Sequence, residues 1–111
     1  MAAETRVLCE LRTICTTLAH ALETTTFGHP TFCNGKNAFA VLETYKGELS
    51  LALRVEKEHQ ALFLKDPRFY LTPYIGGKGW VSLRVGGKVS WTEVRGLVEE
   101  SYRLAGLRKR K

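Results

Sequence analysis

One stretch of strict alternation limits the folds open to this chain. From Glu48 to Val55, leucine or valine fills every second position, and polar or small residues fill the others. A period of two is typical of a β-strand that buries one face. A second apolar stretch covers residues 37–44, and Lys46-Gly47 between the two is a turn signal. The sequence therefore predicts an antiparallel hairpin over residues 37–55.

The turn length decides how the two strands of this hairpin pair. A two-residue Lys46-Gly47 turn pairs Leu42 with Leu51 on the core face. The same register pairs Ala40 with Leu53 on that face and Phe39 with Arg54 on the outer face. A three-residue turn would reverse the faces of the first strand, so both registers stay open on this pattern alone.

Helical periodicity flanks the hairpin on both sides. Apolar residues at three- and four-residue steps predict a first helix that ends near residues 20–23. A short helix is expected over residues 56–65, closed by Asp66-Pro67. The last helix begins at Ser90-Trp91-Thr92-Glu93, which matches a capping box. Gly96 inside that helix suggests close packing on a neighbour.

Further strands are expected between the second and third helices. Pro73 marks residues 69–74 as an edge strand or the end of a strand. Residues 80–85 alternate again, and a brief strand is expected at 88–89. This order predicts an α+β fold, a two-layer sandwich in which one antiparallel sheet carries its helices on one face. We expect one domain over residues 1–107 and a basic tail over 108–111.

Composition excludes several classes of protein. The chain has 111 residues, of which 44% are hydrophobic and 25% charged, as in an ordinary globular domain. Its apolar runs are far shorter than the roughly 20 residues of a membrane span, and charges interrupt any signal-peptide core. The three cysteines cannot all pair with one another, which favours reduced thiols. We therefore expect a soluble cytoplasmic protein.

The positive charge is concentrated at one end of the sequence. The formal net charge is +6, and the last four residues, Arg108, Lys109, Arg110 and Lys111, supply four positive charges. Cations after a final helix also favour its dipole and aid solubility, so the tail by itself does not identify an anionic partner.

The outer face of the sheet is where the sequence places candidate binding residues. Alternation puts Trp80, Ser82 and Arg84 on this face, together with Arg54 of the neighbouring strand. Aromatic and arginine side chains on an open sheet are typical of surfaces that stack bases and contact phosphates. The same composition is typical of a protein–protein hot spot, and a covering loop would make Trp80 part of the core.

Other chemistry has little support in the sequence. The Gly76-Gly77-Lys78-Gly79 loop leads into a strand and matches no nucleotide-binding motif, although its turn could place Lys78 beside a nucleic-acid backbone. Lys88 follows a second glycine pair. No catalytic triad, zinc spacing or activated nucleophile is evident. We therefore expect no enzyme activity, no metal and no cofactor.

Several segments resemble one known family. Phe27-Gly28-His29-Pro30, residues 35–40 and residues 51–55 resemble the first half of the MmcQ/YjbR family, and residues 74–81 and 100–104 resemble its Gly-Lys-Gly-Trp loop and terminal Ser-Tyr helix. The resemblance runs from about Leu22 to Ala105. It implies a CyaY-like, double-wing fold, a monomer and DNA binding. Arg54 stands where many members have lysine, which keeps a cation there.

Iron delivery, which the CyaY likeness would also suggest, lacks the acidic ridge it needs on the first helix. The leading hypothesis is weak, salt-sensitive binding to DNA phosphates. The alternative is a protein- or small-ligand-binding module on the outer sheet face around Trp80. The residues predicted to contact nucleic acid are Lys36, Arg54, Lys78, Trp80, Arg84, Lys88, Arg108, Lys109, Arg110 and Lys111.

Overall fold

A computed structural model describes residues 3–107, with the side chain of residue 107 left out. Its sheet has six strands in the order β1-β2-β3-β4-β6-β5, and every neighbouring pair is antiparallel. The strands are β1 (Ala21–Thr26), β2 (His29–Asn34), β3 (Asn37–Tyr45), β4 (Glu48–Arg54), β5 (Phe69–Leu71) and β6 (Trp80–Arg84). The helices are α1 (Ala3–Cys15), α2 (Lys57–Leu64) and α3 (Trp91–Leu107), and a 3₁₀ turn, η1, covers Gly76–Lys78.

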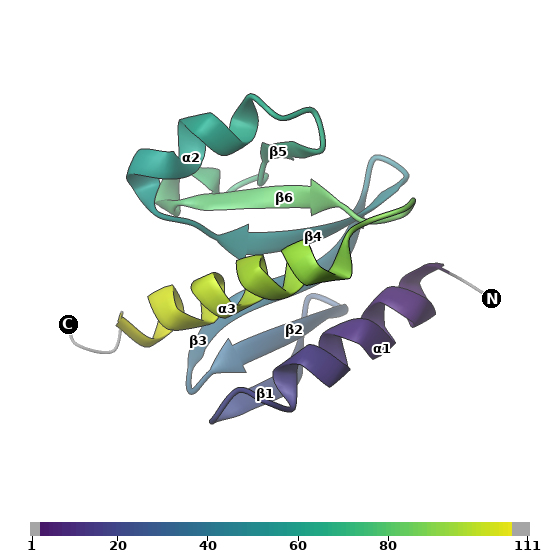
Figure 1. Ribbon diagram of the computed structural model, residues 1–111, viewed down its shortest axis with the longest axis vertical. Coiled ribbons are helices and arrows are strands. Elements are labelled where there is room, and N and C mark those ends of the chain that lie inside the picture. Colours follow the sequence, from purple (N-terminus) through teal and green to yellow (C-terminus); the bar gives the residue numbers. More distant parts are fainter. Residues whose placement is uncertain (1–2, 108–111) are drawn as a thin grey trace.

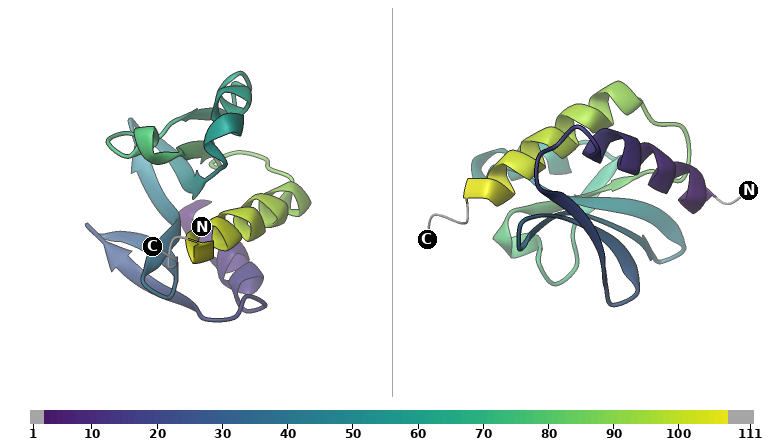
Figure 2. Two further views of the ribbon diagram at one scale, coloured as in Figure 1. Left: turned by 90° about the vertical axis from the view of Figure 1, so that its left-hand side faces the viewer. Right: turned by 90° about the horizontal axis from the view of Figure 1, so that it is seen from below.

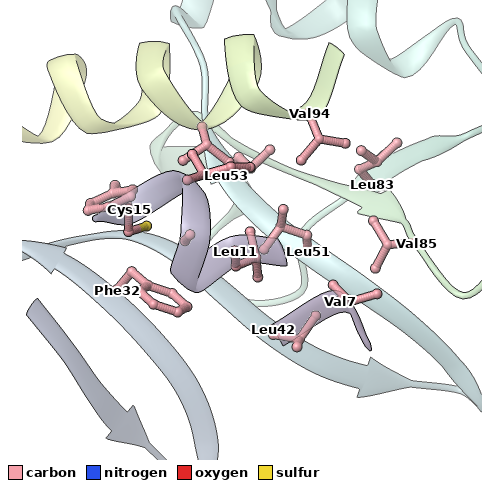
Figure 3. Packing of buried hydrophobic residues seen from close by; sticks show 14 of the residues in the cluster. Val7, Leu11, Cys15, Phe32, Leu42, Leu51, Leu53, Leu83, Val85 and Val94 are labelled. Atoms are coloured by element: carbon pink, nitrogen blue, oxygen red, sulfur yellow. The ribbon is translucent and has the colours of Figure 1, made fainter. Parts of the chain in front are cut away.

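The two long helices lie across one face of this sheet (Figure 1), and Figure 2 shows the strands beneath both of them. Side chains from α1, α3 and that sheet face interdigitate in the core (Figure 3). Val7, Leu11, Leu51, Leu53 and Val98 are all fully buried there. The predicted α+β fold with an antiparallel sheet is therefore confirmed. Helix α2 packs instead beside β5 and β6, at the edge of the sheet.

The predicted pairing of the central hairpin is confirmed. Ala40 pairs with Leu53 and Leu42 with Leu51, across a two-residue turn at Lys46-Gly47. Both turn residues have positive φ, +52° and +84°, as a type I′ turn requires. Of the two registers that the sequence pattern left open, the structure has the one with the two-residue turn.

The predicted end of the first helix is wrong. Helix α1 ends at Cys15, where the hydroxyls of Thr16 and Thr17 donate to the backbone oxygens of Thr13 and Ile14. Such side-chain bonds compete with helix propagation. The chain reverses by way of His20, at φ +65°, and then forms β1.

Strands β1 and β2 form a hairpin that the sequence did not predict. Strand β1 is exposed at five of its six positions, so its residues show no alternation of apolar and polar types. Phe27 and Gly28 make the turn, with φ of +51° and +83°, and Thr26 pairs with His29 across it. Backbone pairing, rather than burial, holds this edge strand in the sheet.

Three features at or near α3 differ from expectation. Ser90 caps the helix by accepting a bond from the Glu93 amide at 3.3 Å, but the Glu93 carboxylate binds Arg68 instead of completing the capping box. A β-carbon added at Gly96 would meet nothing within 4 Å, so the expected close packing there is wrong. The brief strand expected at residues 88–89 is also absent.

Candidate functional site: a cationic end and an outer hollow

Trp80 is not an exposed aromatic platform. Only 4% of the residue is accessible, and the Arg54 guanidinium lies 4.8 Å from its ring centroid. Helix α2 contributes to this corner, because the Gln60 amide donates to the Trp80 backbone oxygen at 3.0 Å. The ring leaves no open face on which a base could stack. Of the readings open at the sequence level, the structure supports a covered Trp80.

Phe39 does not lie on the outer face either, although the predicted hairpin register had placed it there. Strand β3 bulges here, because Phe32 pairs with Ala40 and Cys33 with Ala38, which leaves Phe39 without a partner in β2. A bulge turns the extra side chain to a new direction. Phe39 is fully buried against Tyr102 of α3, with ring centroids 5.5 Å apart. Its expected outward position is therefore wrong.

The two sheet arginines that were predicted to contact nucleic acid form hydrogen bonds within the protein instead. The Arg54 Nε donates to the Ala38 backbone oxygen at 2.7 Å. Arg84 donates to the Glu48 carboxylate and to the Pro67 backbone oxygen, both at 2.7 Å, and lies over the Tyr70 ring. These arginines join neighbouring strands and loops, so each has a structural role.

The lysines behave differently from the arginines. Among the described residues, every ion pair with a carboxylate uses an arginine or His29, and none uses a lysine. Lys36, Lys78 and Lys88 are all exposed. Their positive charges therefore face solvent and form no ion pair with a carboxylate of the described residues.

The sheet separates these lysines into two groups. Lys36 lies in the β2–β3 turn, and Lys78 lies just before Trp80, which pairs with Arg54 at the same end of the sheet. Lys57, at the start of α2, joins them and donates to the Gly77 backbone oxygen at 2.9 Å. We call Lys36, Arg54, Lys57 and Lys78 the cationic end. Lys88 lies at the opposite end, beside Arg6, so the structure does not bring it together with the others.

Helix α3 finishes at the cationic end. The Asn34 and Asn37 side-chain amides donate to the backbone oxygens of Tyr102 and Ala105, at 3.2 and 3.0 Å. These bonds satisfy carbonyls that the last turn of a helix leaves open. The predicted tail contacts Arg108, Lys109, Arg110 and Lys111 lie outside the described residues.

The glycine loop before β6 is not a phosphate cradle. The Gly76, Lys78 and Gly79 amides donate to the backbone oxygens of Thr72, Ile75 and Gly76. A cradle needs amides that point outward to a shared anion. Gly76 packs closely here, because a β-carbon added to it would lie 2.5 Å from Leu71 Cγ and the Leu71 side chain would have to move. The loop therefore positions Lys78 but offers few amides to a ligand.

A hollow on the outer face of the sheet was not predicted. It has a volume of about 270 Å³ and is lined by Val41 and Ala52 of the central strands and by segments on either side. His29 Nε2 and Glu43 Oε1, also in the lining, lie 3.7 Å apart. We call this cavity the outer hollow. It is on the side of the sheet away from α1 and α3.

Two exposed aromatic residues form the rim of the outer hollow. Phe27 and Tyr74 are 95% and about 103% accessible, and both have positive φ, +51° and +69°. Tyr74 is the centre of a γ-turn, in which the Ile75 amide donates to the Pro73 oxygen at 2.8 Å. A left-handed backbone costs a bulky residue about 1–2 kcal/mol. The Phe27-Gly28 dipeptide is the sequence signal for the β1–β2 turn, which contains the first of these two aromatic residues.

The cysteines do not form a reactive centre. Burial raises the pKa of the Cys15 thiol to about 11. Burial also raises the pKa of Cys33, although Arg54 opposes the shift. No group of three metal-binding side chains occurs within residues 3–107, and no helix there could cross a membrane.

Comparison with known proteins gives a family and a fold. The family model described as YjbR matches residues 16–104. Among solved structures, the chain is similar to a Deinococcus radiodurans protein with a DUF419 domain: identity is 25%, the TM-score is 0.75, and the match covers 87% of this chain and 76% of that one. No curated protein matches.

Two further structures show the same fold at lower identity. A Pseudomonas syringae protein has a TM-score of 0.74 and 15% identity, over 87% of this chain and 97% of its own. A Bacillus subtilis protein of the DUF1801 family has a TM-score of 0.58 and 16% identity, over 96% of this chain and 80% of its own.

Proposed function

The chain belongs to the YjbR family, and we propose that it is a non-catalytic protein that binds DNA through the phosphate backbone at its cationic end. The observation that carries this proposal is the position of Lys36, Lys57 and Lys78. Within residues 3–107 these three lysines form no ion pair with a carboxylate, and they gather where α3 ends. The monomeric state and the CyaY-like, double-wing description stay predictions.

The spacing of these lysines suits a nucleic-acid backbone. From the β2–β3 turn to β6 is about two and a half strand spacings, or roughly 12 Å. Duplex DNA presents one charge per about 1.7 Å of its axis, so roughly seven phosphates fall within that span. Several lysines can therefore be neutralised at once, with release of counterions.

We propose binding without base readout. Trp80 is covered and Arg54 and Arg84 hold their own strands together, so the side chains that were predicted to stack on bases are occupied. Lysine contacts to phosphate position a protein on DNA but carry no sequence information. The sequence continues after the cationic end into the basic residues 108–111, which add to the same electrostatic attraction.

The test compares two double variants of equal charge. Lys36→Gln with Lys78→Gln removes two charges from the cationic end, whereas Lys46→Gln with Lys88→Gln removes two from the opposite end. Fluorescence anisotropy with labelled duplex DNA is measured across a tenfold range of salt. We expect the first variant to lose roughly tenfold in affinity and to flatten the log–log salt slope by about 1.8. The second variant should change little.

A chain that ends at Leu107 separates the folded domain from the tail. We expect this shorter chain to bind more weakly but to keep the difference between the two double variants. Equal losses from both variants would mean that net charge alone attracts DNA. Loss of all binding on truncation would assign the activity to the tail and contradict a site on the fold.

A further inference from the structure

The outer hollow is independent of the cationic end and has the features of a ligand site. Val41 and Ala52 give it an apolar floor on the sheet face that α1 and α3 do not cover. Its volume, about 270 Å³, lies just below the range of roughly 300–1,000 Å³ that holds drug-sized molecules. It therefore fits a small molecule.

The rim of the outer hollow has no explanation in the stability of the fold. Phe27 and Tyr74 bury almost none of their surface, at 95% and about 103% accessibility, so their rings add little to the core. Both residues also adopt the left-handed backbone that bulky side chains avoid. Strained backbone that carries exposed aromatic rings points to a role in binding.

The charge of the lining favours one chemical class of ligand. Glu43 is the carboxylate among the residues that line the hollow, and no lysine or arginine accompanies it there. Its nearest partner is His29, whose Nε2 lies 3.7 Å from the carboxylate, longer than a good hydrogen bond. Among the lining residues this carboxylate stands beside aromatic rings, whereas the Lys46 ammonium, outside the lining, lies 5.5 Å from the Tyr45 ring centroid.

We propose that the outer hollow binds a small organic cation with an alkylated ammonium group. A diffuse positive charge is attracted by the faces of aromatic rings, which Phe27 and Tyr74 offer at the rim. The Glu43 carboxylate adds a direct electrostatic attraction, while the methyl groups of the ligand contact Val41 and Ala52. A ligand of this kind matches the floor, the rim and the charge together.

The test uses two probes of nearly equal shape that differ in charge. Choline is compared with its uncharged carbon analogue, 3,3-dimethylbutan-1-ol, by following backbone amide NMR signals of the full chain. We expect choline to shift the signals of Val41, Ala52 and Ile75 and to bind at least tenfold more tightly than the alcohol. No shift with choline, or equal binding of both probes, would overturn the proposal.

Three variants assign the interaction to its residues. Glu43→Gln keeps the shape of the hollow and should lower choline affinity about tenfold, without weakening the alcohol. Tyr74→Ala should weaken choline severalfold while leaving the rest of the spectrum native. Glu58→Gln removes one negative charge on α2, outside the lining of the hollow, and should leave binding unchanged. If Glu58→Gln weakens choline as much as Glu43→Gln does, the attraction is general and the proposed site is wrong.

Discussion

Ser101 joins the helix layer to the sheet at a point where two strands separate. Its hydroxyl donates to the Phe39 backbone oxygen at 2.6 Å and accepts from the Arg54 amide at 2.8 Å. Phe39 and Arg54 would pair directly if the β3–β4 register continued. The side chain of Ser101 therefore replaces one rung of the ladder, and it is fully buried.

Replacing Ser101 with alanine should destabilise the protein. The substitution removes two hydrogen bonds made by a buried hydroxyl, to the Phe39 carbonyl and from the Arg54 amide, a loss of about 1–3 kcal/mol. Urea unfolding of Ser101→Ala and wild type measures the difference. A loss below about 0.5 kcal/mol would mean that the two strands close on each other and restore the missing bond.

The three thiols should differ in reactivity. Cys9 is exposed, whereas Cys15 is buried and its pKa is raised to about 11. At pH 8, roughly one Cys15 side chain in a thousand is then a thiolate. A disulfide reagent such as dithionitrobenzoate should label Cys9 first, and Cys9→Ser should remove the fast phase. Rapid labelling of Cys15 in the native protein would contradict this order.

At the scale of the elements, the β1–β2 turn combines strain with exposure. Phe27 occupies the first position of a type I′ turn, where asparagine is preferred. Phe27→Asn should therefore raise the free energy of unfolding by about 0.5–1 kcal/mol, while weakening choline binding at the outer hollow. Thermal unfolding and NMR titration measure the two effects. A variant that is less stable would show that the exposed ring supports the hairpin.

Helix α3 contains two glycines, and replacing them with alanine should affect stability in opposite directions. Gly96→Ala should stabilise the protein by about 1 kcal/mol, because a new β-carbon has free space and alanine favours the helix. Gly106→Ala serves as the matched control, since its β-carbon would lie 2.9 Å from Asn34 Nδ2. Urea unfolding of both variants checks the pair. Equal effects would show that space beside the helix is unimportant.

Across the whole molecule, arginine–carboxylate pairs connect distant segments. Arg68 hydrogen-bonds to Asp66 and to Glu93, which links the loop after α2 to the first turn of α3. These bonds lower the pKa of both carboxyls. Arg103 likewise lowers the pKa of Glu100, and Arg12 that of Glu23. The arginines therefore stabilise the fold, whereas the lysines give it its surface charge.

These pairs predict a loss of stability in acid. A carboxyl whose pKa is lower in the folded state contributes stability above its unfolded pKa, and that stability disappears as the pH falls through the folded value. The melting temperature should thus fall between about pH 5 and pH 2. The Arg68→Met variant should have a lower melting temperature than wild type at pH 7, and its melting temperature should fall less on acidification. Parallel curves of melting temperature against pH for the variant and wild type would show that Arg68 does not cause the loss of stability in acid.

Much of the fold could be predicted because the determining interactions are local. The Lys46-Gly47 turn and the alternation from Glu48 to Val55 predicted the β3–β4 hairpin and one of its two possible registers, which the structure has, and Ser90 indicated where α3 begins. The β1–β2 hairpin escaped prediction because β1 is exposed and has no apolar pattern. The alternation of inward and outward side chains gave the wrong face for Phe39, because the bulge there depends on how β2 pairs with β3.

For the candidate sites too, some features follow from the residue types and others depend on tertiary contacts. The sequence by itself determined that the lysines and the basic tail supply the positive charge, because charge is a property of each residue. Alternation also identified the outer face that carries Trp80, but not what covers it. Burial of Trp80, the pairing of Arg84 with Glu48 and the outer hollow depend on contacts between segments far apart in the chain. Only the tertiary structure decides these, because solvent access is a property of the packed surface as a whole.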